Sequence, residues 1–100
     1  MQPARVQKVK VVKSHLAAKK YDAIFSAPDF RKVVPFGASG YEDYTTHKDP
    51  IRRERYLKRH SGENWDNPMT AGSLSRYLLW GESTSFNENL REFKRRFKLA

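Results

Sequence analysis

The chain has 100 residues, with 20 Lys plus Arg against 11 Asp plus Glu and a formal net charge of +9 at pH 7. This length allows one small domain, and the absence of cysteine excludes disulfides, thiolate metal ligands and cysteine nucleophiles. Only 38% of the residues are hydrophobic, and no apolar run approaches the roughly 18–20 residues that a membrane-spanning helix needs. We therefore expect no transmembrane segment and no secretory signal, and the positive charge favours a polyanionic partner.

The N-terminal third of the sequence predicts strands. Residues 1–20 carry six basic side chains and no acidic one, which is typical of a basic arm, although the alternation within 6–13 also fits a strand. Residues 21–26 and 30–36 are strand-forming segments separated by a turn. Pro35 has no amide hydrogen to donate, so the last of these strands should lie at a sheet edge or end there.

Capping signals predict three helices in the rest of the chain. Asp49 followed by Pro50 begins a helix over residues 50–61. A second helix begins after Thr70 and ends near residues 79–80; it is apolar nearly all round, so we expect it at the centre of the core.

The third helix begins after Ser85, which forms a predicted capping box with Glu88. Its apolar stripe consists of Phe86, Leu90, Phe93 and Phe97. Strands followed by helices predict an α+β fold, with a small N-terminal antiparallel hairpin or three-stranded sheet and then three helices. We expect an arm over residues 1–20 and one domain over residues 21–100.

The excess positive charge lies in three blocks, at residues 1–20, 51–60 and 91–100. Within the middle block, arginines recur at i, i+3 and i+7, a spacing that places them on one helical face and suits hydrogen bonding to successive phosphates. The alternative is a solvated face on which Glu54 pairs with Lys58. The side chains that we expect to contact a nucleic-acid backbone are Lys8, Lys10, Lys13, Lys19, Lys20, Arg52, Arg55, Lys58, Arg59, Arg91, Lys94, Arg95 and Lys98.

Other polar and aromatic residues have simpler structural interpretations. Arg76, the one charged residue of the apolar helix, should pair with Asp66 or Glu82, and Trp65 and Trp80 should belong to the core. The cluster of Asp43, His47 and Asp49 is a weak metal-site candidate. The sequence has no glycine-rich phosphate loop and no nucleophile elbow, so we expect no cofactor, no metal and no enzymatic activity.

Residues 36–99 resemble the dinoflagellate/viral nucleoproteins, small basic proteins of large DNA viruses. The resemblance rests on an ordered set of motifs: FG followed by GYEDYT and HKDP, then R-Y-x-x-RH, E-x-W, TAG with SRYLLW, and a final RRF. It implies sequence-nonspecific binding of double-stranded DNA and genome compaction or packaging, in the virion or in the host nucleus or cytoplasm. Two alternatives remain open: a minor component of a viral capsid or inner shell that binds other virion proteins, and an RNA-binding module.

Overall fold

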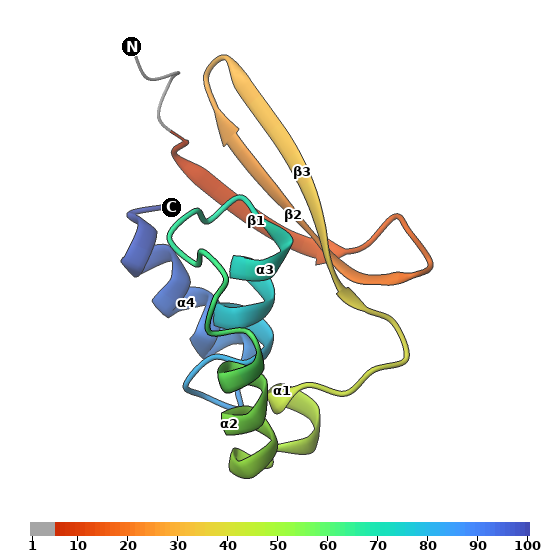
Figure 1. Ribbon diagram of the computed structural model, residues 1–100. Coiled ribbons are helices and arrows are strands. Elements are labelled where there is room, and N and C mark those ends of the chain that lie inside the picture. The colour runs from red at the N-terminus through yellow and green to blue at the C-terminus, as the bar shows by residue number, and fades with distance from the viewer. Residues whose placement is uncertain (1–5) are drawn as a thin grey trace.

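Three antiparallel strands and the helices that follow them make up the described part of the chain, residues 6–100 of a computed structural model (Figure 1). The sheet has the order β1-β2-β3. The α+β fold expected from the sequence is therefore confirmed, with a three-stranded sheet rather than a single hairpin. The strands are β1 (Lys8–Lys13), β2 (Lys19–Ala27) and β3 (Phe30–Ala38), and the helices are α1 (Tyr44–His47), α2 (Pro50–Arg59), α3 (Ala71–Leu74), the π-helix η1 (Ser75–Leu79) and α4 (Phe86–Phe97).

The basic N-terminal segment contributes directly to this sheet. Residues 8–13, within the predicted strand at 6–13, pair with β2 in a register that sets Val9 opposite Phe25. Residues 19–20, also expected in the arm, begin β2. The first five residues of the expected arm lie outside the described residues.

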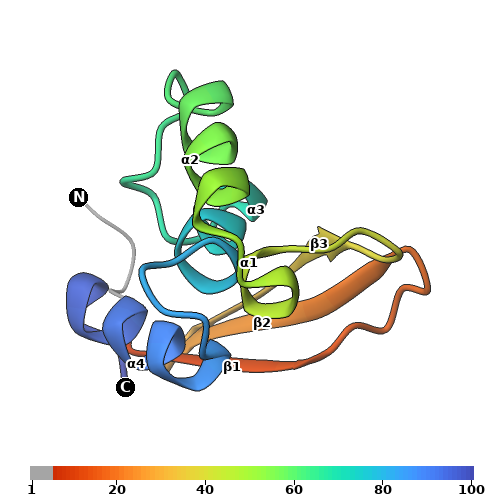
Figure 2. The same cartoon turned by 90° about the horizontal axis from the view of Figure 1, so that it is seen from below.

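The helices gather on one side of the sheet (Figure 2), and the core lies between them. Side chains alternate between the two faces of a strand, so one face of β1 to β3 supplies valines and aromatics to this core. Leucines of α3 and η1 and one phenylalanine of α4 complete it, which agrees with the central position expected for the apolar helix. The buried hydrophobic residues are Val9, Ala23, Phe25, Val34, Phe36, Leu74, Leu78, Leu79 and Phe93.

The two tryptophans lie at the margin of this core rather than inside it. Trp80 is half-buried and packs against the core cluster. Trp65 is also half-buried but is not part of that cluster. The prediction that both tryptophans belong to the core is therefore only partly correct.

The helix at residues 50–61 is confirmed as α2, with one turn of helix before it that the sequence did not predict. The carboxylate of Asp49 accepts hydrogen bonds from the amides of Ile51 and Arg52, and Pro50 occupies the first helical position. The extra turn, α1, is begun by a capping box in which Asp43 and Thr46 bond reciprocally. Two helices therefore begin within the polar stretch of residues 41–49, for which hydrophobic periodicity alone predicts a loop.

The apolar helix begins after Thr70 as predicted but changes its hydrogen-bond pattern midway. The Thr70 hydroxyl accepts a hydrogen bond from the Ser73 amide, and α3 follows. From Ser75 the ladder widens, and the Trp80 amide donates to the Ser75 carbonyl over 3.0 Å. Such π-turns are rare and occur frequently at functional sites.

Only half of the capping box predicted for α4 is formed. The Ser85 hydroxyl accepts a hydrogen bond from the Glu88 amide, as predicted. The Glu88 carboxylate, however, accepts from the Ser83 hydroxyl instead of the Ser85 amide. The Ser85 amide donates to the Ser83 hydroxyl oxygen. The apolar stripe of α4 is confirmed: Phe93 is buried, and the other three members pack against the core. None of the helices within residues 6–100 has the length and apolar character required to cross a membrane.

Candidate nucleic-acid interface

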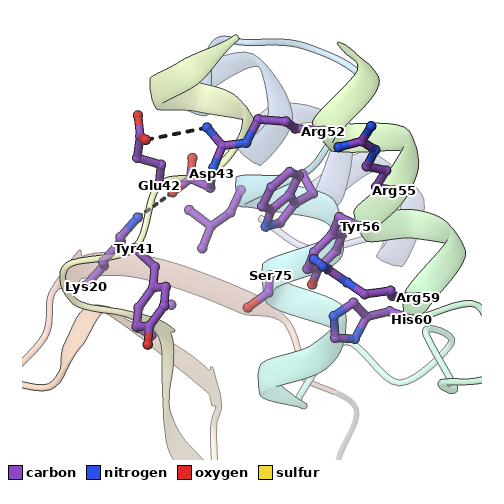
Figure 3. A pocket seen from close by; sticks show the side chains of 14 residues that line it. Lys20, Tyr41, Glu42, Asp43, Arg52, Arg55, Tyr56, Arg59, His60 and Ser75 are labelled. Carbon is purple, nitrogen blue, oxygen red and sulfur yellow. Dashed lines mark hydrogen bonds and ion pairs between the residues drawn. The ribbon is translucent and has the colours of Figure 1, made fainter. Parts of the chain in front are cut away.

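A hollow of about 430 Å³ lies between α2 and the segment that joins β3 to α1 (Figure 3). We call it the α2 hollow. One wall is the basic side of α2, the other carries Lys20 and Tyr41, and the floor comes from η1 and the residue after it. The polar and aromatic side chains that line it are Lys20, Tyr41, Glu42, Asp43, Arg52, Arg55, Tyr56, Arg59, His60, Ser75 and Trp80.

Three of the predicted arginines share the α2 wall. Arg52, Arg55 and Arg59 are all exposed and line the hollow. Arg52 makes an exposed ion pair with Glu42, over 3.5 Å between Nη1 and Oε1, and such pairs contribute little stability. Arg55 and Arg59 have no ion-pair or hydrogen-bond partner for their side chains within residues 6–100. The α2 wall therefore presents guanidinium groups that are free to bind an anion.

The predicted residue Lys58 does not line this wall, and the alternative in which it pairs with Glu54 is wrong. Both side chains are exposed, and no ion pair joins them in the described part of the chain. The inward side of α2 is formed in part by Tyr56 and Leu57, which are half-buried, whereas Ile51 is 61% exposed.

The opposite wall is fixed by an ion pair between Lys20 on β2 and Asp43, the residue that caps the start of α1. The Lys20 ammonium donates to the Asp43 carboxylate over 2.6 Å. That carboxylate is almost fully buried and also accepts from the Thr45 amide. Breaking a buried pair of this kind leaves an uncompensated charge, so Lys20 has a structural role in addition to lining the hollow.

Aromatic side chains form the floor. Tyr56 stacks on Trp80 with 4.2 Å between ring centroids and 3° between planes, and His47 contacts the same indole. Burial, reinforced by the negative charge of Glu63, raises the pKa of Tyr56 to about 12. Because these rings are packed against each other, Tyr41, which is 74% exposed, is the aromatic side chain left free at the mouth.

Two further arginines face inward and support the floor. Arg53 Nε donates to the carbonyl oxygens of Trp80 and Gly81, over 3.2 and 2.8 Å. Arg76 Nη1 donates to the same Trp80 carbonyl over 3.2 Å. These contacts satisfy carbonyl groups that the end of η1 leaves without helical partners.

The acidic partner predicted for Arg76 is absent. Its guanidinium lies 5.1 Å from the ring centroids of both Trp65 and Tyr77, and no ion pair to Asp66 or Glu82 is formed among the described residues. Burial, together with the nearby charge of Arg53, lowers the pKa of Arg76. Aromatic faces carry negative potential and take the place of a carboxylate here. The sequence alone does not predict these aromatic partners.

The remaining predicted contacts lie away from the hollow. The end of α4 is joined to the start of β1 by backbone hydrogen bonds from Ala100 to Gln7 and from Val9 to Ala100, over 2.8 and 3.1 Å. We call the basic side chains at this end of the molecule the α4–β1 surface. The exposed face of β1 contributes Lys8 and Lys10, and α4 and the residue after it contribute Arg91, Lys94, Arg95 and Lys98. Arg95 is ion-paired with Glu92 over 3.1 Å. Lys13 and Lys19 flank the β1–β2 connection and belong to neither group.

The residues of the weak metal-site candidate are engaged locally. Asp43 is ion-paired with Lys20, and His47 Nδ1 accepts a hydrogen bond from the Asp49 amide over 2.9 Å. In residues 6–100 no three His, Asp or Glu side chains are placed to hold a metal ion.

Comparison with known protein families identifies a match over the first part of the chain. The sequence profile of a family of unknown function, DUF5754, matches residues 9–60. No curated protein and no solved structure matches the chain. The matched segment contains both walls of the α2 hollow, including Lys20, Tyr41 and the arginines of α2, whereas the floor from η1 follows it.

Proposed function

The chain belongs to DUF5754, a family of unknown function, and we propose that it binds the backbone of double-stranded DNA without sequence preference. The observation that carries the proposal is the row of exposed arginines on α2, of which Arg55 and Arg59 have no partner within residues 6–100. Guanidinium groups form paired hydrogen bonds with phosphate oxygens, and neutralising phosphates releases counterions from the duplex. Contacts of this kind position a protein on DNA without reading its sequence.

The separation of the basic groups favours compaction over simple coating. In Figure 2 α2 lies at the top of the molecule, and α4 with the start of β1 lies apart from it at the lower left. A protein with two separated cationic surfaces can neutralise phosphates of two duplex segments at once. Compaction or packaging of a viral genome is the role that the resemblance of residues 36–99 to the nucleoproteins implies.

The test is the salt dependence of binding to a 30-base-pair duplex, with an unrelated duplex and an RNA hairpin measured alongside. We expect both duplexes to bind equally and the logarithm of affinity to fall linearly with the logarithm of salt concentration. Replacing Arg55 and Arg59 together by Ala should reduce the slope by about 1.8, because each lost phosphate contact contributes about 0.9.

The matched control is the double replacement of Arg31 and Lys32 by Ala. Both residues are exposed and outside the predicted contact set, and their loss changes the net charge by the same amount. An equal fall in slope in the control would show that net charge alone sets the affinity and would refute the α2 assignment. No duplex binding at 50 mM salt, or tighter binding of RNA, would overturn the proposal and redirect the search to virion proteins or RNA.

A further inference from the structure

We propose that the α2 hollow is a binding site for a phosphate monoester, the terminal phosphate of a nucleotide. This goes beyond backbone binding, because an internal phosphodiester carries one negative charge, whereas a phosphate monoester carries about −1.5 to −2 at pH 7. Two sources supply this chemistry, the 5′-phosphate of a DNA strand and a free nucleoside monophosphate.

The charges that line the hollow match a dianion. Four cationic side chains line it, but Lys20 is neutralised by Asp43 and Arg52 is paired with Glu42. His60, also on the wall, contacts Glu63 outside the hollow. What remains is the charge of Arg55 and Arg59, which is +2.

The spacing of Arg55 and Arg59 along α2 allows both side chains to reach a single phosphate group. Arg55 and Arg59 are four residues apart, which is about 6 Å along a helix axis and places them on the same face. Figure 3 shows Arg59 reaching from α2 toward the hollow, with Tyr41 on the opposite wall. Each planar guanidinium offers paired N–H donors, so two of them can hold three phosphate oxygens.

The size of the hollow and its free aromatic ring point to a nucleotide rather than to another phosphorylated group. A volume of about 430 Å³ lies within the range of small-molecule sites, roughly 300–1,000 Å³. Tyr41 is 74% exposed and has no aromatic partner within residues 6–100. An exposed tyrosine beside a cationic site is a platform on which a base stacks. The phosphate would therefore lie on Arg55 and Arg59, and the base on Tyr41.

The experiment has two arms, one for each source. In the first, 12-base-pair duplexes with and without 5′-phosphates compete for the protein. In the second, titration calorimetry compares adenosine monophosphate, adenosine and inorganic phosphate. We expect the phosphorylated ligand to bind about tenfold more tightly than its unphosphorylated counterpart in at least one arm, since charge-assisted hydrogen bonds contribute roughly 1.5–3 kcal/mol, or tenfold and above.

Variants assign the effect to the hollow. Replacing Arg55 and Arg59 by Ala should abolish the preference for the phosphorylated ligand, whereas Arg91→Ala on the α4–β1 surface should lower duplex affinity and keep the preference. Tyr41→Leu should weaken adenosine monophosphate without changing inorganic phosphate, and Tyr41→Phe should restore binding. Unchanged thermal unfolding of the arginine variants checks that the fold is intact.

The outcomes separate this inference from the proposed function. Duplex binding with no preference for a terminal phosphate in either arm overturns the inference and leaves the proposed function standing. Binding of adenosine monophosphate through Arg55 and Arg59 without any duplex binding does the reverse. A preference that survives in the Arg55/Arg59 variant, or a phosphoserine peptide that binds as tightly as adenosine monophosphate, also overturns the nucleotide site.

Discussion

Replacing Asn89 by Ala should destabilise the protein more than any other polar substitution on α4. Asn89 is 3% exposed, although it lies on a helix whose other polar side chains are mostly at the surface. Its carboxamide accepts a hydrogen bond from the Ser83 amide over 3.0 Å and donates to the carbonyl oxygens of Leu78 and Ser83 over 3.2 and 2.8 Å. It thereby connects α4 to the end of η1 and to the segment between them.

The magnitude follows from these three bonds. Each intramolecular hydrogen bond contributes about 1 kcal/mol net, so their loss costs about 3 kcal/mol. The higher helix propensity of alanine offsets roughly 0.6 kcal/mol of this loss. We expect a loss of about 2.5 kcal/mol in the free energy of unfolding, and a fall in melting temperature of about 10–20 °C for a domain of this size.

Urea unfolding followed by far-ultraviolet circular dichroism measures this loss. Asn87→Ala is the matched control, because Asn87 lies two residues earlier on the same helix, is exposed and makes no side-chain hydrogen bond with the described residues. We expect the control to lie within about 0.5 kcal/mol of the wild type. A loss below 1 kcal/mol for Asn89→Ala, or an equal loss for the control, would refute the reasoning.

Two further predictions concern acid stability and a close backbone contact. Burial disfavours the charge of Asp22, but hydrogen bonds from His15 and Ser14 outweigh this and lower its pKa from 3.8 to about 2. Its stabilisation is therefore present above pH 3.8 and lost as the pH falls to 2, so Asp22→Asn should flatten the dependence of urea unfolding on pH in that window; an equally steep curve contradicts this. Gly81→Ala should lower the urea midpoint, because its Cβ would lie 2.4 Å from the Tyr77 carbonyl oxygen, and overpacking costs about 1–3 kcal/mol. Gly62→Ala, with no atom within 4 Å of the added Cβ, should leave the midpoint unchanged or raise it, and equal effects of the two would disprove the contact.

The fold could be predicted from the sequence wherever a local signal decides the structure. The Asp49-Pro50 start of α2, the Thr70 cap and the apolar stripe of α4 each depend on residues within a few positions of one another, and all three are confirmed. The change to a π-helix at Ser75 was not predictable in this way. It accompanies tertiary contacts at the end of η1, where Arg53 comes from a helix far away in the sequence.

The candidate site could be predicted only in part, for the same reason. Helical spacing placed Arg52, Arg55 and Arg59 on one face, and the structure puts them on one wall of the α2 hollow. The facing wall depends on the Lys20–Asp43 ion pair, whose members are 23 residues apart. No local pattern joins two residues at that separation, so Tyr41 gave no signal as part of the site.

The arginines of α2 show how helical phase divides structural from binding roles within one basic block. Arg53 lies one position from Arg52 and two from Arg55, yet it is half-buried and bonded to the carbonyl oxygens that end η1. Successive residues on a helix point about 100° apart, so neighbours in a charge run face different surroundings. Removing Arg53 leaves the Gly81 carbonyl oxygen without its donor, although Arg76 still bonds that of Trp80. Removing Arg55 breaks no hydrogen bond within residues 6–100. A count of basic residues does not distinguish Arg53 from Arg55. The direction in which each side chain points from the helix axis decides that Arg53 stabilises the floor of the α2 hollow and that Arg55 is available to bind a phosphate.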